Sequence, residues 1–465
     1  MHFTRRQFLY GTTAATAALA LSPHAFSQQA GLKGSLDAAL SAPVERGDIV
    51  GVIGAITDAS DTIYSGAFGE RQLDGGVAMT DDTVCNIASM TKAITGACAM
   101  QLVEQGKLDL DSPVSTWIPQ AAELKVLDGW DGDKPVLRAP KTEMTLRHLM
   151  THTTGMGYTQ WSADLLKVAQ ATQPNGVFPE LDYDDPATWV VQPLMFDPGT
   201  DWLYGISIDW IGRLVQEISG QPLGTYMEDN IFAPLGMTST GYTVTPDMQA
   251  RQATVHLRGA DGTIGLLDPQ PPLDLSHGYG GGGLSSTVPD YQRFIRMILN
   301  DGSAGGNQLL KPETVAEMSK NQMGDIRVKM LPTTNPALSP DAEFFPGLPK
   351  SWSLTFMIND EEAPTGRPAG SLAWAGFYNT FYWIDPVNKV GGVFMSQLLP
   401  FVEPKTLQAF SDFESAYSRR FGLTGAPAGV VPPPAAPPRR PRGDARPRAE
   451  GSFRGAEPRP STVAR

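Results

Sequence analysis

Hydrophobic and polar residues alternate near both ends of the chain, a pattern that predicts β-strands. Toward the N-terminal end, Ile49–Ile56 and Thr62–Phe68 flank the turn residues Asp58–Asp61 and predict a hairpin. Toward the C-terminal end, aromatic and β-branched residues mark four further strands, and a helical pattern follows them. These strands are Ser351–Ile358, Ser371–Trp374, Tyr378–Ile384 and Val390–Gln397, and the helix is Thr406–Phe421.

The middle of the chain carries apolar residues at helical spacing. Glycines follow the last turn of three of these helices, at Gly106, Gly220 and Gly302. The predicted helices are Met90–Gln105, Leu146–Thr151, Ile208–Ser219 and Asp290–Asn300. We therefore predict an α+β fold. One sheet is built from both chain ends, about residues 28–80 and 340–424, and a mainly helical lobe of about residues 81–339 is inserted. The junction of the two lobes is the natural place for a cleft and a site.

The first residues have the features of an export signal. Thr4–Leu9 has the twin-arginine pattern, Gly11–Leu21 is apolar, and Ala25-Phe26-Ser27 offers small residues for cleavage. We expect residues 1–27 to be a signal peptide and the protein to be periplasmic, or secreted beyond the periplasm. The apolar stretch is too short to span a bilayer, and no other run reaches eighteen apolar residues, so no membrane anchor is expected.

Charge is unevenly distributed along the 465 residues, whose formal net charge is −13. The C-terminal tail, residues 425–465, is rich in Pro and Arg and is expected to be disordered. It holds eight arginines and three acidic residues, so the body without the tail and the signal peptide carries −20. Such a body repels nucleic acid and anionic membranes. The tail itself is either a solvated appendage or a contact for an anionic surface.

Ser89-Met90-Thr91-Lys92 is the only Ser-x-x-Lys in the chain, and it opens a predicted helix. Residues three apart lie one turn apart on the same helix face, so the Ser89 hydroxyl and the Lys92 amine are expected to face the same space. A serine attacks once a neighbouring base takes its proton, and an amine can be that base. About one such motif arises by chance in a chain this long, so the motif alone does not establish a catalytic site.

Two other segments supply candidate partners for Ser89. The Pro198-Gly199 turn places Tyr204 on a loop before a helix, where a phenol can shuttle a proton to a leaving group. The segment Trp374-Ala375-Gly376-Phe377 lies on a predicted edge strand beside the cleft. An outward amide there, together with the amide of Ser89, would make an oxyanion hole. Each segment also has a purely structural interpretation. Tyr204 could be an aromatic anchor that closes its loop, and Trp374 could be an aromatic residue of the sheet core beside a bulge.

The remaining motifs favour a structural role over a catalytic or metal-binding one. His277–Gly283 is glycine-rich but lacks the Lys-Ser/Thr of a phosphate loop, so it predicts a tight turn leading into a helix. His148 and His152 are four apart without the glutamate of a zinc protease motif, which favours a capped helix end over a metal site. Cys85 and Cys98 could form a disulfide, but Cys98 falls inside an apolar helix, so two buried thiols are expected.

Taken together and in this order, the motifs resemble those of the serine β-lactamase and penicillin-binding-protein superfamily, in particular its class C β-lactamase-like branch, the family VIII carboxylesterases. The motifs are Ser89-x-x-Lys92, Leu149–Met156, Pro198–Tyr204, Gly281–Thr287 and Trp374-x-Gly376, within about Leu36–Phe421. The resemblance implies a β-lactamase/transpeptidase-like fold, with an antiparallel sheet flanked by terminal helices. It further implies that Ser89 is the acylated nucleophile, that Lys92 and Tyr204 form the general-base pair, and that the amides of Ser89 and Phe377 form the oxyanion hole.

Two departures from class C β-lactamases bear on the substrate. Ile206 stands where those enzymes have the asparagine of Tyr-x-Asn, and Trp374-Ala375-Gly376 stands where they have Lys-Thr-Gly. The lysine of that triplet helps to hold the carboxylate of a β-lactam. Losing such a charge-assisted contact costs about 1.5–3 kcal/mol, whereas a neutral ester loses nothing. Tryptophan at this place resembles the esterase branch, and Tyr204-Gly205 before Ile208-Asp209-Trp210 resembles its acyltransferase-like members.

The favoured hypothesis is a serine esterase that cleaves short-chain carboxylic esters through an acyl-enzyme on Ser89. Trp374, Ala375, Gly376 and Ile206 would line the substrate site, and no cofactor or metal is implied. The alternatives are a β-lactamase or D-alanyl-D-alanine carboxypeptidase, an acyltransferase, and a non-catalytic receptor for cell-wall fragments. The expected partner is a small-molecule ester, with no nucleic acid and no stable membrane anchor.

Overall fold

The computed structural model describes residues 23–267 and 278–418. The predicted tail lies outside these residues, as does most of the predicted signal peptide, so disorder and export both stay predictions. The first described element is helix α1 (Pro23–Glu45), a terminal helix of the kind that the resemblance implies, although the hydrophobic pattern did not predict its bounds. Within the described ranges, no helix combines the length and the apolar character needed to cross a bilayer.

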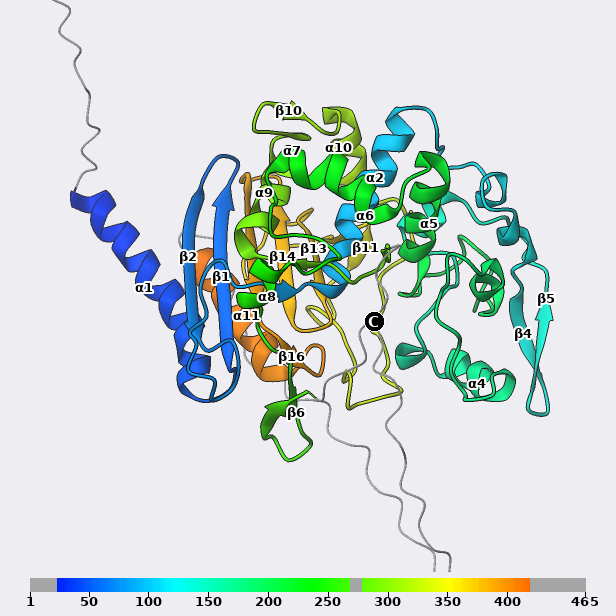
Figure 1. Ribbon diagram of the computed structural model, residues 1–465, viewed down its shortest axis with the longest axis horizontal. Helices are drawn as coiled ribbons and strands as arrows, with labels where there is room; N and C mark the ends of the chain where they lie inside the picture. Colours follow the sequence, from blue (N-terminus) through cyan, green and yellow to red (C-terminus); the bar gives the residue numbers. More distant parts are fainter. Residues whose placement is uncertain (1–22, 268–277, 419–465) are drawn as a thin grey trace, which may run out of the picture.

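A seven-stranded antiparallel sheet forms the centre of the fold, in the order β11-β12-β13-β14-β15-β1-β2. Its strands come from both ends of the chain (Figure 1). They are β1 (Gly51–Asp58), β2 (Thr62–Gly69), β11 (Lys350–Trp352), β12 (Met357–Asn359), β13 (Leu372–Gly376), β14 (Thr380–Asp385) and β15 (Val390–Met395). The pairing of Gly54 with Phe394 joins the two ends. The predicted α+β class with an antiparallel sheet is therefore confirmed.

One predicted strand is wrong. The segment Ser351–Ile358 is not one strand but two, β11 and β12, which pair with each other. The chain reverses between them because Thr355 adopts a φ of 82° and the amide of Ser353 donates to the carbonyl of Phe356. Such a backbone conformation is uncommon for a β-branched residue, so propensity alone predicts an uninterrupted strand.

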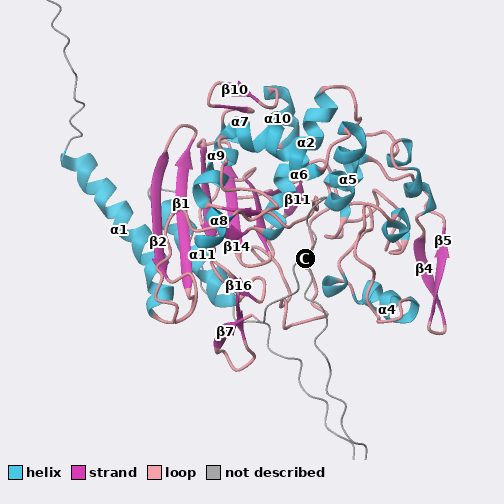
Figure 2. Cartoon of the chain, viewed as in Figure 1, coloured by secondary structure: helices cyan, strands magenta, loops and turns pink. Residues whose placement is uncertain are grey.

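Helices cover both faces of the sheet (Figure 2). On one face lie α1 and α11 (Pro404–Ser418), close enough to β1 that a Cβ at Gly54 would press on Leu40 and Phe413. On the other face lies α9 (Val288–Leu299), which approaches Gly391 of β15 through Ile295. Glycines in these strands thus allow close packing of helix on sheet.

The remaining elements form the mainly helical part of the molecule. Helix α2 (Thr91–Glu104) is buried from Thr91 to Leu102, and helix α5 (Ser207–Ser219) packs against it before ending at Gly220, whose φ is 71°. The β4–β5 hairpin lies at the far side from β1 and β2 (Figure 1). The other elements are β3 (Cys85–Asn86), β4 (Val126–Asp131), β5 (Lys134–Arg138), α3 (Leu146–Met150), α4 (Ala163–Thr172), α6 (Leu223–Met227), α7 (Ala233–Leu235), α8 (Pro246–Ala250), β6 (His256–Arg258), β7 (Ile264–Leu266), β8 (Ser285–Ser286), β9 (Ser303–Ala304), β10 (Asn307–Gln308), α10 (Pro312–Met318) and β16 (Leu398–Leu399).

Candidate active site

Ser89 lies in a short 3-10 turn, Ala88–Met90, that leads into α2. The helix predicted over Met90–Gln105 therefore starts one residue early, since the α-helix begins at Thr91. Ala88 adopts a φ of 42°, a left-handed conformation that costs an alanine on the order of 1 kcal/mol and persists only where the surroundings fix it. The turn carries Ser89 to a partly exposed position at the entrance of α2.

Lys92 is one turn further along and is 1% exposed. Its Nζ donates to the Ser89 Oγ at 3.0 Å, to the carbonyl of Gly281 at 2.6 Å and to the hydroxyl of Tyr158 at 3.3 Å. The three acceptors are a serine hydroxyl, a backbone carbonyl and a phenol oxygen. The amine is thus held against the serine hydroxyl, in the geometry that a general base for this hydroxyl needs.

The glycine-rich segment positions the carbonyl that binds Lys92. The amide of Gly281 donates to Asp209 Oδ1 of α5 at 3.0 Å, and Thr95 of α2 donates to the carbonyl of Gly280 at 2.7 Å. A Cβ at Gly280 would clash with the carbonyl of Ile208, and one at Gly281 would meet the Asp209 carboxylate. The predicted tight turn is confirmed for the part of the segment that the structure describes, residues 278–283.

Tyr204 lies beside Lys92 and is 2% exposed. The Lys92 Nζ is 4.9 Å from the centre of its ring, and its hydroxyl oxygen accepts a hydrogen bond of 3.1 Å from the Trp374 indole. The structure therefore brings together Ser89, Lys92, Tyr204 and Trp374, which the sequence analysis selected separately. The Trp374 indole thus holds the Tyr204 ring in place beside Lys92.

Tyr158 is a second tyrosine at this site, and the sequence analysis missed it. Its hydroxyl contacts Lys92, and its ring centre lies 5.5 Å from that of Tyr204. The available signal was Gly157, directly before Tyr158, and Gly205, directly after Tyr204. A Cβ at Gly205 would clash with the backbone of Gly157, so the two tyrosine-bearing loops touch backbone to backbone.

The loop that carries Tyr204 is anchored at its start by an ion pair. Arg138, at the end of β5, contacts both carboxylate oxygens of Asp197 at 2.7 and 2.8 Å, and the amide of Lys141 donates to the same carboxylate at 2.8 Å. The Arg138 contact lowers the pKa of Asp197 to about 2. Asp197 therefore stays charged at neutral pH and ties the β4–β5 hairpin to this loop.

Strand β13 supplies the predicted oxyanion segment, with one correction. The strand is not at the sheet edge but third in order; β12, however, pairs only with Leu372 and Ala373. The half of β13 from Trp374 to Gly376 is therefore unpaired on that side. A Cβ at Gly376 would clash with the carbonyl of Ile87, so glycine is required where β13 approaches the Ser89 turn. The amide of Phe377 follows directly. Among the described residues, this amide donates none of the backbone hydrogen bonds found outside the helices and strands.

Ile206 and the buried histidine His152 complete the surroundings. Ile206 is partly exposed and precedes α5. His152 is fully buried, with its ring centre 4.8 Å from that of Tyr204. Burial, and secondarily the charge of Lys92, holds its pKa well below the usual range, so this imidazole is neutral. The sequence analysis did not connect His152 with Tyr204.

The predicted capped helix end and buried thiols are confirmed. His148 accepts a hydrogen bond from the amide of Thr145 in a capping box at the start of α3. No group of His, Cys, Asp or Glu in the described ranges is arranged to hold a metal ion. Cys85 and Cys98 are free, buried thiols, and burial raises the pKa of Cys85 to about 12.

Comparison with known proteins shows that the chain belongs to the beta-lactamase family, whose sequence profile matches residues 36–416. Lovastatin esterase of Penicillium rubens is 33% identical over 77% of this chain and 91% of its own length. Monacolin J acid methylbutanoyltransferase of Aspergillus terreus is 30% identical over 82% of this chain and 94% of its own length. A solved structure of simvastatin synthase from Aspergillus terreus is 30% identical, with a TM-score of 0.70 over 85% of this chain and 98% of that chain. The predicted superfamily and its fold are thus confirmed.

Proposed function

We propose that this protein is a serine esterase that cleaves short-chain carboxylic esters through an acyl-enzyme on Ser89. The observation that carries the proposal is the 3.0 Å contact between the Lys92 Nζ and the Ser89 Oγ, at a site whose adjoining strand presents Trp374 rather than a lysine. The first feature supplies an activated nucleophile, and the second removes the cation that would hold the carboxylate of a β-lactam.

The reaction proceeds in two balanced steps. The Ser89 Oγ bonds to the ester carbonyl carbon while Lys92 takes its proton, and the amides of Ser89 and Phe377 donate to the carbonyl oxygen as it becomes negative. The bond to the alkoxide then breaks, and the proton passes through Lys92 and Tyr204 to the leaving oxygen. Water next attacks the acyl carbon and gives a proton to the same base. The bond between the acyl carbon and the Ser89 Oγ breaks, the base returns the proton to Oγ, and the acid leaves.

Acyl transfer to an alcohol is the second candidate function. The relatives named above include a methylbutanoyltransferase as well as an esterase. Within this chain, Lys92 and Tyr204 are at most 2% exposed. A site that excludes water from its base slows hydrolysis relative to attack by a bound alcohol.

Ester hydrolysis is expected to exceed β-lactam hydrolysis by at least about tenfold to hundredfold in kcat/KM, because Trp374 offers no charge to a carboxylate. The test compares p-nitrophenyl acetate and p-nitrophenyl butyrate with nitrocefin on the purified protein. Equal efficiency with nitrocefin would favour a β-lactamase instead. Product analysis in the presence of butanol separates the two candidates, since an acyltransferase forms butyl butyrate in preference to butyrate.

Replacing Tyr204 with Phe is expected to lower kcat/KM for p-nitrophenyl butyrate by about 10²–10⁴-fold, the usual contribution of a proton-transferring group. Tyr158→Phe keeps the ring and removes one neutral hydrogen bond to Lys92, so a loss of only about tenfold is expected. The two variants serve as mutual controls, because each deletes one phenol oxygen from a tyrosine ring that lies near Lys92 Nζ. A larger loss in Tyr158→Phe would transfer the proposed role to Tyr158.

A further inference from the structure

Asn86, three residues before Ser89, is held through its backbone by one side chain. The amide of Asn86 donates to the Gln397 Oε1 at 3.0 Å, and the Gln397 Nε2 donates to the carbonyl of Asn86 at 3.0 Å. The side-chain amide of Gln397 thus bonds both backbone groups of one residue, as a neighbouring strand does in an antiparallel pair. Because Gln397 is 4% exposed, water competes little for these two bonds.

These bonds bear directly on the turn that carries Ser89. Ala88 has a positive φ, a conformation that persists only where the surrounding structure fixes it. The chain that enters the turn has two such restraints in addition to its pairing with β8. The amide of Ile87 donates to the carbonyl of Leu284 at 3.0 Å, and Gln397 binds the residue before it. Gln397 therefore helps to fix the place of the Ser89 amide.

The residues on either side of Gln397 hold the turn that carries Phe377. The hydroxyl of Ser396 donates to the carbonyl of Tyr378 at 3.3 Å. The amide of Leu398 donates to the same carbonyl at 3.2 Å. Tyr378 directly follows Phe377, whose amide is the second donor of the proposed oxyanion hole. One segment of three residues is thus bonded to both turns that carry an oxyanion donor.

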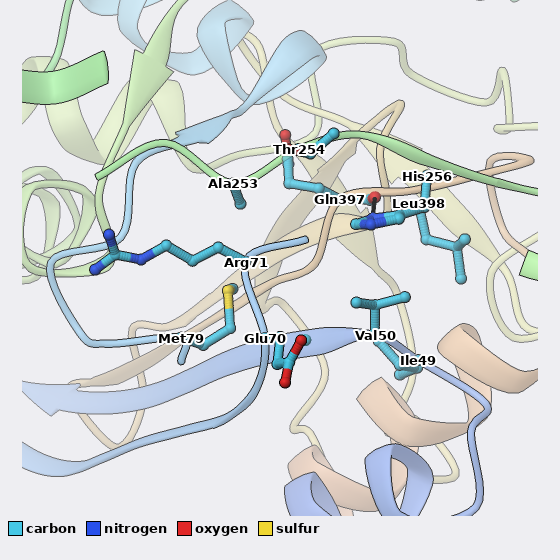
Figure 3. A pocket seen from close by; sticks show the side chains of 11 residues that line it. Ile49, Val50, Glu70, Arg71, Met79, Ala253, Thr254, His256, Gln397 and Leu398 are labelled. Carbon is cyan, nitrogen blue, oxygen red and sulfur yellow. Dashed lines mark hydrogen bonds between the residues drawn. The ribbon is translucent and has the colours of Figure 1, made fainter. Parts of the chain in front are cut away.

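This segment is itself held from another side by β6. The amide of His256 donates to the carbonyl of Gln397 at 2.8 Å, and Leu398 pairs with His256 in the parallel contact of β16 with β6. Figure 3 shows Gln397 and Leu398 beside His256. The cavity that these residues line has room for about one water molecule. The segment therefore has little space in which to shift.

We propose that Gln397 is a positioning residue for the oxyanion hole, which sets the spacing between the amides of Ser89 and Phe377. Its side chain reaches the first turn through Asn86, and its chain neighbours reach the second turn. The inference rests on the proposed function, in which both amides donate to the carbonyl oxygen as it becomes negative. Two donors stabilise this oxygen fully only when each lies about 2.7–3.1 Å from it, so their spacing acts on kcat more than on KM.

Gln397→Met is the first test, because it keeps the length of the side chain and removes both bonds to Asn86. For p-nitrophenyl butyrate, kcat is expected to fall about 10²-fold, the cost of misplacing a catalytic group by about 1 Å, and KM is expected to stay nearly unchanged. The rate at which a fluorophosphonate labels Ser89 should fall by a similar factor, since its phosphoryl oxygen needs the same two donors. Both rates are measured on folded protein, checked by circular dichroism.

Gln101→Met is the matched control. Gln101 is 9% exposed, and its Nε2 donates to two backbone carbonyls, those of Asn230 and Leu309, at 3.2 Å each. The control therefore makes the same chemical change in a buried glutamine that is bonded to neither turn. Both variants should lose stability to urea, and only Gln397→Met should lose kcat.

Gln397→Glu is the conservative variant, and it takes the place of Gln397→Met should that protein fail to fold. Its carboxyl keeps an acceptor for the amide of Asn86, but a carboxylate also sets an oxygen against the carbonyl of Asn86. Protonation restores a donor there, and burial raises the pKa of such a carboxyl. Relative to the wild type at the same pH, kcat of Gln397→Glu should therefore rise as the pH falls from 8 to 5.5. Gln397→Met should show no such rise, although it keeps His256, the titratable side chain that contacts the carbonyl of residue 397.

The outcomes separate the inference from the function on which it rests. Wild-type kcat in Gln397→Met, an equal loss of kcat in Gln101→Met, or a loss confined to KM would overturn the role of Gln397 and leave the esterase proposal standing. If the wild-type protein hydrolyses no ester, the proposed activity is wrong, and the labelling rate of Ser89 decides the inference. Slower labelling in Gln397→Met alone then supports it, and equal labelling in all proteins overturns it.

Discussion

Ser89→Ala is expected to lower the rate of p-nitrophenyl butyrate hydrolysis by at least about 10³-fold. The residual rate would come from substrate binding and from the amides of the oxyanion hole. The variant loses the one oxygen that forms the acyl bond. Lys92 keeps its hydrogen bonds to Gly281 and Tyr158, so the buried amine stays partnered and the fold should persist. Initial rates on matched amounts of folded protein, checked by circular dichroism, measure the effect.

Ser115→Ala is the matched control for this variant, because Ser115 is also partly exposed and also lies in a short 3-10 turn, Val114–Thr116. It should retain wild-type activity. A fluorophosphonate probe should add its mass to the peptide that contains Ser89 in the wild type and in Ser115→Ala, but not in Ser89→Ala. Activity kept by Ser89→Ala would sink the assignment of the nucleophile, and a wild-type protein that resists the probe would favour a non-catalytic receptor.

The nucleophile and its base were accessible from the sequence because their relationship is local. Ser89 and Lys92 are three residues apart, and helical geometry alone places them on one side. The strands and helices that carry the site were equally accessible wherever apolar periodicity is regular, as in β14 and α5. The predictions were wrong where the backbone is irregular. The positive φ of Thr355 divides one predicted strand into two, and the positive φ of Ala88 precedes a short turn, so that the helix begins only at Thr91.

The other parts of the site depend on contacts between distant segments, which periodicity does not encode. Tyr158 reaches Lys92 across 66 residues, and the carbonyl of Gly281 does so across 189. Asp209 matters only because α5 brings its carboxylate to the amide of Gly281. The glycines themselves were the detectable signal, since Gly205 and Gly280 approach another backbone, and Gly281 approaches the Asp209 carboxylate, too closely for a side chain.

A buried ion pair behind the sheet is expected to contribute strongly to stability. Arg367, between β12 and β13, lies 2.8 Å from Glu414 of α11, and their side chains are 3% and 1% exposed. Burial raises the pKa of the Glu414 carboxyl and lowers that of the Arg367 guanidinium, while the attraction between the two charges opposes both shifts. The attraction between the two charges therefore offsets much of the cost of burying each of them.

Arg367→Met is expected to reduce the free energy of unfolding by about 3–5 kcal/mol at pH 8, because Glu414 is left buried and charged without its partner. Without Arg367, the pKa of Glu414 in the folded state rises further above its ordinary value of 4.5. The penalty therefore exists above that value and shrinks as the pH falls toward it. Urea unfolding at pH 8 and at pH 5.5 should show the smaller loss at the lower pH.

The double variant Arg367→Met/Glu414→Leu distinguishes the lost partner from lost packing. Replacing both charges by apolar groups of similar size is expected to recover most of the stability, and to remove the pH dependence along with the carboxyl group. If the double variant is as unstable as Arg367→Met, the cost lies in the shape of the guanidinium, which also lies 5.1 Å from the ring centre of Phe345. Recovery would instead establish that the pair links α11 to the sheet chiefly because each charge makes the other's burial possible.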